Sequence, residues 1–230
     1  EKAAASAKTT NKLLNVSEFT DVNEATEAMV SMSQAYDTLS KDDIVDKLNN
    51  VGNNFSISTQ GLAEGLQRSA SALKTAGNDM DSAIALMTAG NAVVQDPTSV
   101  GAGLRTIALR LTGTKEGAQS LQDSGEDIDG MITTVSKLRD TIKSATAVAS
   151  NGFKGFDIFD KNGNYKSTYE ILLGISQVYK EIVETDAKTG SNNKNLLLET
   201  IAGKNRANIA ASILENPSLL EKAYKSSKYD

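Results

Sequence analysis

Short runs of apolar residues, spaced by three and four positions, fill most of this chain and constrain its fold more than any other feature. The first run consists of Val22, Ala25, Met29, Met32, Tyr36 and Leu39. That spacing places these side chains on one face of a helix, and such a face must pack against a partner. The run is too short for the heptads of a coiled coil, which favours a helix packed on its own domain over an intermolecular seam.

Comparable stripes recur along the chain. The predicted apolar faces are Ile44, Leu48, Val51 and Phe55; Leu62, Leu66, Ala70 and Leu73; Met80, Ala83, Ile84 and Met87; Val100, Leu104, Ile107 and Leu111; Ile132, Val135, Leu138 and Ile142; and Leu172, Ile175, Val178, Tyr179 and Ile182. Three more short helices are predicted after a polar loop at Thr185–Asn195. The sequence therefore predicts a mainly α protein, a compact multi-helix bundle of short helices.

Helix starts and stops can be placed from single residues. Asp96 and Pro97 suit the cap and first position of a helix, as do Asn216 and Pro217. Ser167 with Glu170 predicts a capping box, and Gly203 predicts a helix stop. Small residues predict places where helices approach closely, because they let backbones come near each other. These residues are Gly61, Gly65, Ala76, Gly90, Gly101 and Gly103.

One small β-hairpin is predicted near residues 156–166. Phe156–Phe159 alternates in polarity, and the Asn162-Gly163 pair suits a tight hairpin turn. The same stretch imitates part of a calcium-binding EF-hand loop, but Ile158 and Tyr169 then fall where that loop needs oxygen ligands. The predicted organisation is a polar segment at 1–20, a helical lobe at 21–150 and a hairpin with a helical lobe at 151–230, the two lobes packed as one domain.

Composition excludes much chemistry. The chain has no His, Cys or Trp, so imidazole or thiolate catalysis, zinc–thiolate sites and disulfides are ruled out. The net charge is −5 and the basic residues are scattered, which argues against nucleic-acid binding. No apolar run approaches the length that crosses a bilayer, and no signal peptide is evident. The absence of an initiator Met suggests a segment of a longer protein.

Two groups of residues could form a functional site, and each also has a simpler explanation. The acidic cluster at Asp123–Asp129 could hold a cation, but its spacing matches no ion-binding loop and it more simply complements the N-terminus of the next helix. Ser71 with Lys74, and Lys188-Thr189-Gly190, imitate two motifs of penicillin-binding enzymes, whose middle motif is missing. We therefore predict no catalytic residue, no metal site and no cofactor, and hence no enzyme.

Two arginines, Arg105 and Arg110, lie on the predicted helix whose apolar face is Val100–Leu111. An arginine stem can pack beside apolar side chains while its head binds a carboxylate. The sequence thus predicts a structural role for both, paired with acidic groups from neighbouring helices or loops.

Three stretches together resemble the conserved core of phage tail tape measure proteins. They are Leu62–Leu111, with Asp96-Pro97, Val100-Gly101 and Leu104-Arg105-Thr106; Lys166–Leu172; and Ile201–Lys204 with Ala207-Asn208. The resemblance implies a structural protein of the virion tail, in the tube lumen or at the tip, made in the host bacterial cytoplasm. It further implies tail assembly, length determination and ejection, with copies of itself, possible trimers, and tube, chaperone or tip proteins as partners.

Contact with the host envelope would come through other parts of the parent protein. Two alternatives stay open: a cell-wall glycan hydrolase module, since the many acidic residues guarantee close carboxylate pairs, and a helical secreted effector or adhesin. The segment itself does not resemble the rod that measures a tail, because its predicted helices are short and frequently capped.

Overall fold

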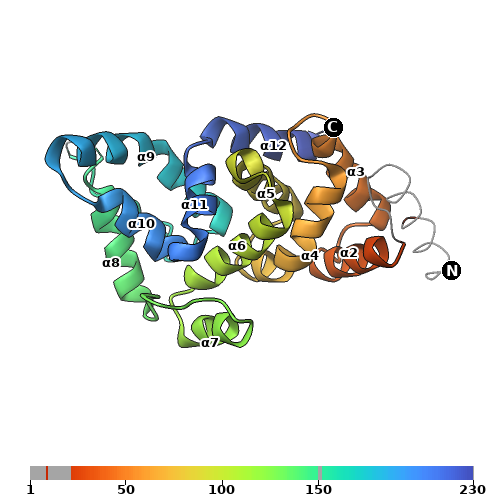
Figure 1. Ribbon diagram of the computed structural model, residues 1–230, viewed down its shortest axis with the longest axis horizontal. Helices are drawn as coiled ribbons and strands as arrows, with labels where there is room; N and C mark the ends of the chain where they lie inside the picture. Colours follow the sequence, from red (N-terminus) through yellow and green to blue (C-terminus); the bar gives the residue numbers. More distant parts are fainter. Residues whose placement is uncertain (1–8, 10–21, 150–151, 230) are drawn as a thin grey trace. The chain divides into compact units, whose positions relative to one another are not determined.

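The computed structural model describes residue 9, residues 22–149 and residues 152–229. This part of the chain forms eleven α-helices and contains no strand (Figure 1). In chain order they are α2 (Val22–Ala35), α3 (Lys41–Gly52), α4 (Thr59–Thr75), α5 (Met80–Val94), α6 (Pro97–Arg110), α7 (Lys115–Asp123), α8 (Val135–Thr146), α9 (Thr168–Thr189), α10 (Asn193–Ala202), α11 (Ala207–Leu214) and α12 (Pro217–Tyr229), with a 3₁₀ turn at Lys204–Arg206. The predicted mainly α fold is confirmed.

The helices group into two compact units. Unit 1 runs up to Arg105 and also takes in the chain from Ser218 onward, whereas unit 2 runs from Thr106 to Pro217. The boundaries therefore fall inside α6 and α12. The division at residue 150 made from the sequence stays a prediction, and the segment predicted at 1–20 lies outside the described residues except for Thr9.

Unit 1 is organised around α4 and α5. Helix α4 packs against α2, α3 and α5, and every residue of α5 from Met80 to Asn91 is buried. The α2 stripe faces this core, with Met29 and Met32 at most 2% exposed. It therefore packs within its own unit, as the shortness of the run predicted.

A small polar cluster joins α12 to the rest of unit 1. Lys47 Nζ lies 2.8 Å from Asp81 Oδ1, and the Ser227 hydroxyl donates to the same oxygen at 2.7 Å. The Ser226 hydroxyl donates to the carbonyl of Asn50. Because Asp81 and Ser227 are both buried, these bonds hold the C-terminal helix in a fixed register on α3 and α5.

Helices α4 and α6 approach so closely that only glycine fits between them. A Cβ added to Gly101 would lie 2.4 Å from the carbonyl oxygen of Gly65, and one added to Gly65 would lie 2.0 Å from Met87. Gly61 meets Pro97 in the same way. The predicted close contacts are thus confirmed for these three glycines, which let two backbones touch.

Most helices begin at the residues that the sequence indicated. The Asp96 carboxylate accepts from Ser99 N at the start of α6, and Ser167 with Glu170 forms the complete capping box of α9. Gly203, with φ +76°, ends α10. The predicted polar loop at Thr185–Asn195 is shorter than expected, because α9 continues to Thr189 and stops only at Gly190. From the sequence, Asp21 is also a plausible cap for the first stripe, and it lies outside the described residues.

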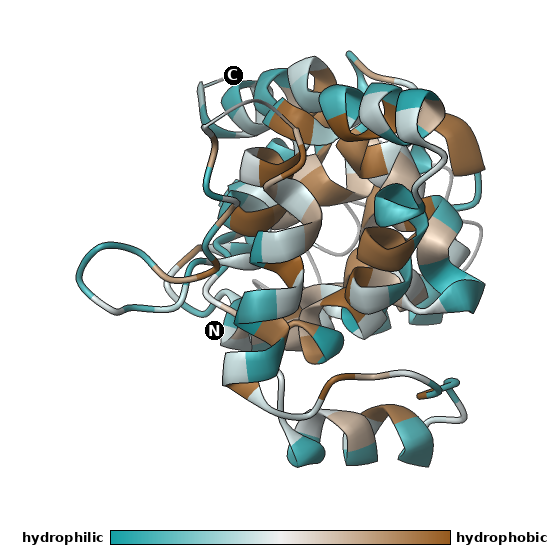
Figure 2. Cartoon of the chain, turned by 90° about the vertical axis from the view of Figure 1, so that its left-hand side faces the viewer, coloured by the Kyte–Doolittle hydropathy of each residue, from teal (hydrophilic) through white to brown (hydrophobic). Residues whose placement is uncertain are grey.

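In unit 2, helices α8, α9, α10 and α11 pack together, with α10 in contact with the other three. Their apolar stripes meet in the interior through Leu138, Ile142, Leu172, Ile175 and Ile201. Brown, hydrophobic residues accordingly line the inner helix faces, and teal, hydrophilic residues cover the outer ones (Figure 2). None of the helices described is long and apolar enough to span a membrane.

The β-hairpin predicted near residues 156–166 is wrong. Only one isolated bridge, between Phe159 and Tyr165, forms in this segment. The Asp160 carboxylate accepts the backbone N–H groups of Asn162 and Asn164, which folds the turn around a side chain. This bridge does not extend into a β-ladder, because Phe156 N donates to the Thr146 hydroxyl on one side and Ser167 caps α9 on the other.

Candidate functional site

The residues that imitate two motifs of penicillin-binding enzymes belong to different units of the fold. Ser71 and Lys74 are exposed on α4, which belongs to unit 1, while Lys188 and Thr189 form the last turn of α9 in unit 2. The third motif of a penicillin-binding enzyme needs a strand at Lys188–Gly190, and the chain has a helix end there.

Three of the carboxylates in the 123–129 loop have hydrogen-bond or ion-pair partners within unit 2. Arg206 Nη2 lies 2.6 Å from Glu126, Gln119 donates to Asp123, and Asp129 N donates to Asp127. Within the described part of the chain, no group of three or more His, Cys, Asp or Glu side chains could hold a metal ion. The loop therefore offers carboxylates to its surroundings and no closed oxygen cage.

Arg110 is the most buried charge in the described part of unit 2, with 1% of its surface exposed. Its guanidinium donates to the carbonyls of Glu199 (3.1 Å) and Thr200 (3.5 Å), in the last turn of α10. Burial lowers its pKa, and the carboxylate of Asp127 opposes that shift. The sequence predicted a carboxylate as the partner of Arg110. In the structure its hydrogen bonds go to the last carbonyls of α10, which lie at the negative end of a helix and need donors.

Gly203 completes this arginine site. A Cβ at Gly203 would lie 3.1 Å from Arg110 Nη1, an atom with no hydrogen-bond partner among the described residues. The arginine thus fills the space left by the helix stop, as a structural residue should. Arg105, the other arginine singled out, is half-buried in α6 and belongs to unit 1.

A strap made of residues 152–166 lies against the C-terminal half of α8. Arg139 binds Asp157 with two hydrogen bonds of 2.8 and 2.7 Å, and its guanidinium also lies over the Phe159 ring. The bond from Arg139 holds the pKa of Asp157 at about 2, below its ordinary 3.8. On the other side, the Phe156 ring fills the notch at Gly174 of α9. The strap is therefore fixed to both helices.

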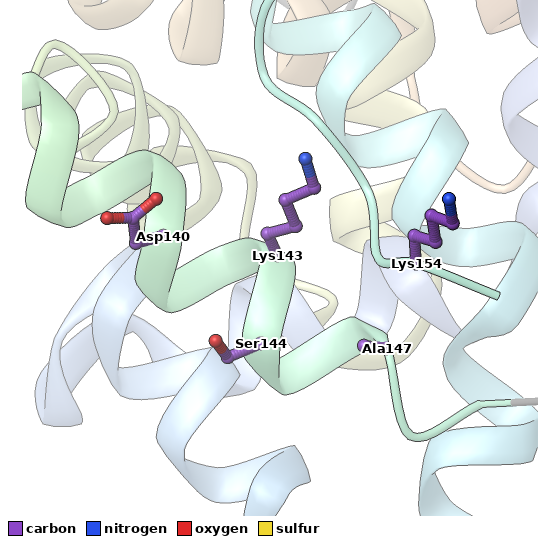
Figure 3. A pocket seen from close by; sticks show the side chains of 5 residues that line it. All are labelled: Asp140, Lys143, Ser144, Ala147 and Lys154. Atoms are coloured by element: carbon purple, nitrogen blue, oxygen red, sulfur yellow. The ribbon is translucent and has the colours of Figure 1, made fainter. Parts of the chain in front are cut away.

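A shallow pocket of about 440 Å³ opens between α8 and the strap. Its lining consists of Asp140, Lys143, Ser144, Ala147 and Lys154. Figure 3 shows the Lys143 and Lys154 side chains extending to the same side, with Asp140 lying farther along α8. No sequence pattern predicted this pocket, because its lysines come from a helix and a loop and neither belongs to a motif.

Removing the Asp157 carboxylate should change stability in a pH-dependent way. Asp157→Asn is expected to lower the free energy of unfolding at pH 7 by less than about 1 kcal/mol, the range of solvent-exposed ion pairs. Because folding lowers the pKa of Asp157, its contribution is present above the unfolded pKa of about 3.9 and is lost as the pH falls toward 2. Urea titrations from pH 7 to pH 2 should show the two proteins converging.

The exposed Glu181 on α9 provides the control for that experiment. Glu181→Gln makes the same acid-to-amide change without a bidentate partner, so it should follow the wild type throughout. A difference between Asp157→Asn and wild type that stays constant down to pH 2 would show that the loss is not electrostatic.

Comparison with known proteins identifies the family to which this chain belongs. A family model described as phage-related minor tail protein matches residues 1–197. That range contains the first two of the three stretches predicted to resemble the tape measure core, and the third begins just after it. No solved structure gave a significant match. Since the family match spans far more than half of the 230 residues, the chain belongs to the phage-related minor tail proteins, the family that tape measure proteins carry.

Proposed function

We propose that this chain is a structural segment of a tape measure protein, taking part in tail assembly, in setting tail length and in ejection. The observation that carries the proposal is the family match over residues 1–197. The family is a structural one. In this role the chain is made in the host cytoplasm and ends in the virion tail, in the tube lumen or at the tip.

The helical content gives a physical basis for a ruler. A continuous helix adds about 1.5 Å per residue, so chain length converts directly into tube length. In the compact units, Gly77 with φ +85° and Gln95 with φ +54° interrupt that path between α4, α5 and α6. A measuring form of this segment therefore requires the interrupted helices to straighten, and the compact units are the form that exists outside the tube.

Straightening would release apolar faces for new contacts. The stripe from Val22 to Leu39 alternates strictly by three and four positions, and it is the best candidate for exchange with copies of the chain. Tube, chaperone and tip proteins of the tail are the other proposed partners. No site among the described residues favours the glycan hydrolase or effector alternatives.

The proposal is tested by looking for the chain in purified tails. Mass spectrometry of isolated virions should find peptides from both units, for example from α4 and α9, in amounts of a few copies per tail. After ejection is triggered and the emptied particles are collected, those peptides should be depleted relative to tube protein. Virions that contain tube protein and lack these peptides would contradict the proposal.

A further inference from the structure

Two lysines at the pocket between α8 and the strap form no ion pair with the described residues. Neither Lys143 nor Lys154 lies within 4 Å of a carboxylate in the part of the chain that is described. Lys143 does lie near enough to Asp157 to favour its charged form, but both oxygens of that carboxylate already bind Arg139. Asp140, the one acid in the lining, lies beside Lys143 and forms no ion pair with either lysine among the described residues.

The two lysines are held together by the backbone. Gly155 has φ +100°, and a Cβ there would lie 2.1 Å from the carbonyl oxygen of Lys143. The neighbouring Phe156 N donates to the Thr146 hydroxyl of α8 at 2.7 Å. Lys154 is therefore anchored one residue away from a close backbone contact, which preorganises the pair of positive charges before any ligand arrives.

The same unit presents a complementary surface. In the 123–129 loop, Asp123, Asp127 and Asp129 are exposed. One oxygen of Asp123 accepts from Gln119 of α7 and one oxygen of Asp127 accepts from Asp129 N, which leaves acceptor positions on these carboxylates open. Asp127 also lies near the buried Arg110, so its charge is used inside the protein. Asp123 and Asp129 are thus the carboxylates that a second molecule could bind.

We propose that the pocket of one molecule binds the acidic 123–129 loop of a second copy of this chain. Lys143 and Lys154 recognise the carboxylates of Asp123 and Asp129, and the Ser144 hydroxyl in the lining provides a further donor. The contact is heterologous, because pocket and loop are different surfaces, so a pair of molecules retains one free pocket and one free loop and assembly can continue head to tail. The proposal does not depend on the tail role, since it is a property of the purified chain.

Charge reversal tests this pairing by sedimentation velocity at low ionic strength over a wide concentration range. The wild type should associate as its concentration rises, and 0.5 M salt should weaken the association at least about tenfold, because exposed charges are then screened. K143E/K154E and D123K/D129K should each stay monomeric. An equimolar mixture of the two variants should associate again, because the unaltered pocket of D123K/D129K can bind the unaltered loop of K143E/K154E, and the altered pocket and altered loop are also opposite in charge.

Controls separate this pairing from general charge effects and from misfolding. K180E/K188E makes the same charge change on exposed positions of α9 and should associate like the wild type. Circular dichroism should show the same helix content for every variant. A wild type that is monomeric at all concentrations would overturn the proposal, as would wild-type association by K143E/K154E or failure of the mixture to associate. None of these outcomes bears on whether the chain is found in tails.

Discussion

Replacing Arg110 with alanine is expected to lower the free energy of unfolding by about 3 kcal/mol, the largest effect of any single change considered. The carbonyls of Glu199 and Thr200 at the end of α10 would lose their guanidinium donor, and the space of a large buried side chain would be left empty. Chemical denaturation followed by circular dichroism measures this loss. Arg110→Lys should recover only part of it, because one ammonium group cannot reproduce the two-pronged guanidinium.

The exposed Arg68 of α4 is the matched control. Arg68→Ala removes the same side chain from the surface and should change stability by no more than about 0.5 kcal/mol. If Arg110→Ala unfolds at the same denaturant concentration as the wild type, the guanidinium does not stabilise α10, and the structural role of Arg110 is contradicted.

Gly101→Ala is the second large effect, and here two contributions oppose each other. Alanine favours a helix over glycine by about 1 kcal/mol. The added Cβ, however, would lie 2.4 Å from the Gly65 carbonyl oxygen and 2.7 Å from its Cα, and these backbone atoms cannot rotate away. Overpacking of this kind costs up to about 3 kcal/mol, so the net expected loss is about 2 kcal/mol.

Thermal and urea denaturation of two variants checks that balance. Ala102→Ser, which also adds one heavy atom at the next position of α6, should change stability by less than about 1 kcal/mol. A Gly101→Ala protein more stable than wild type would mean that α4 and α6 separate easily and that helix propensity dominates.

The helices were predictable because their signals are local. Stripes such as Leu62, Leu66 and Leu73 are fully buried on α4, and the Ser167 and Glu170 cap is read from four consecutive residues. Alternation and an Asn-Gly pair alone were not enough to decide whether a hairpin forms at residues 156–166. Whether the Asp160 side chain or a β-ladder satisfies the turn depends on where the flanking residues are tied, and α8 ties one of them.

The sites depend on contacts between distant residues. The sequence indicated that Arg110 is structural, but its acceptor at Glu199 lies 89 residues away and is a backbone carbonyl, which no side-chain pattern reveals. Lys143 and Lys154 meet because Gly155 has a positive φ and touches the α8 backbone. Gly155, between Lys154 and Phe156, was the only local signal of that close approach.

The central claim is that this chain is a segment of a tape measure protein whose helices count toward tail length. The direct test is electron microscopy of virions whose gene carries an in-frame deletion or an in-frame duplication of residues 168–214, with a recoded wild-type gene as control. The account predicts tails shorter in the first and longer in the second by about 1.5 Å for each residue changed. Intact tails of wild-type length in both variants would contradict it.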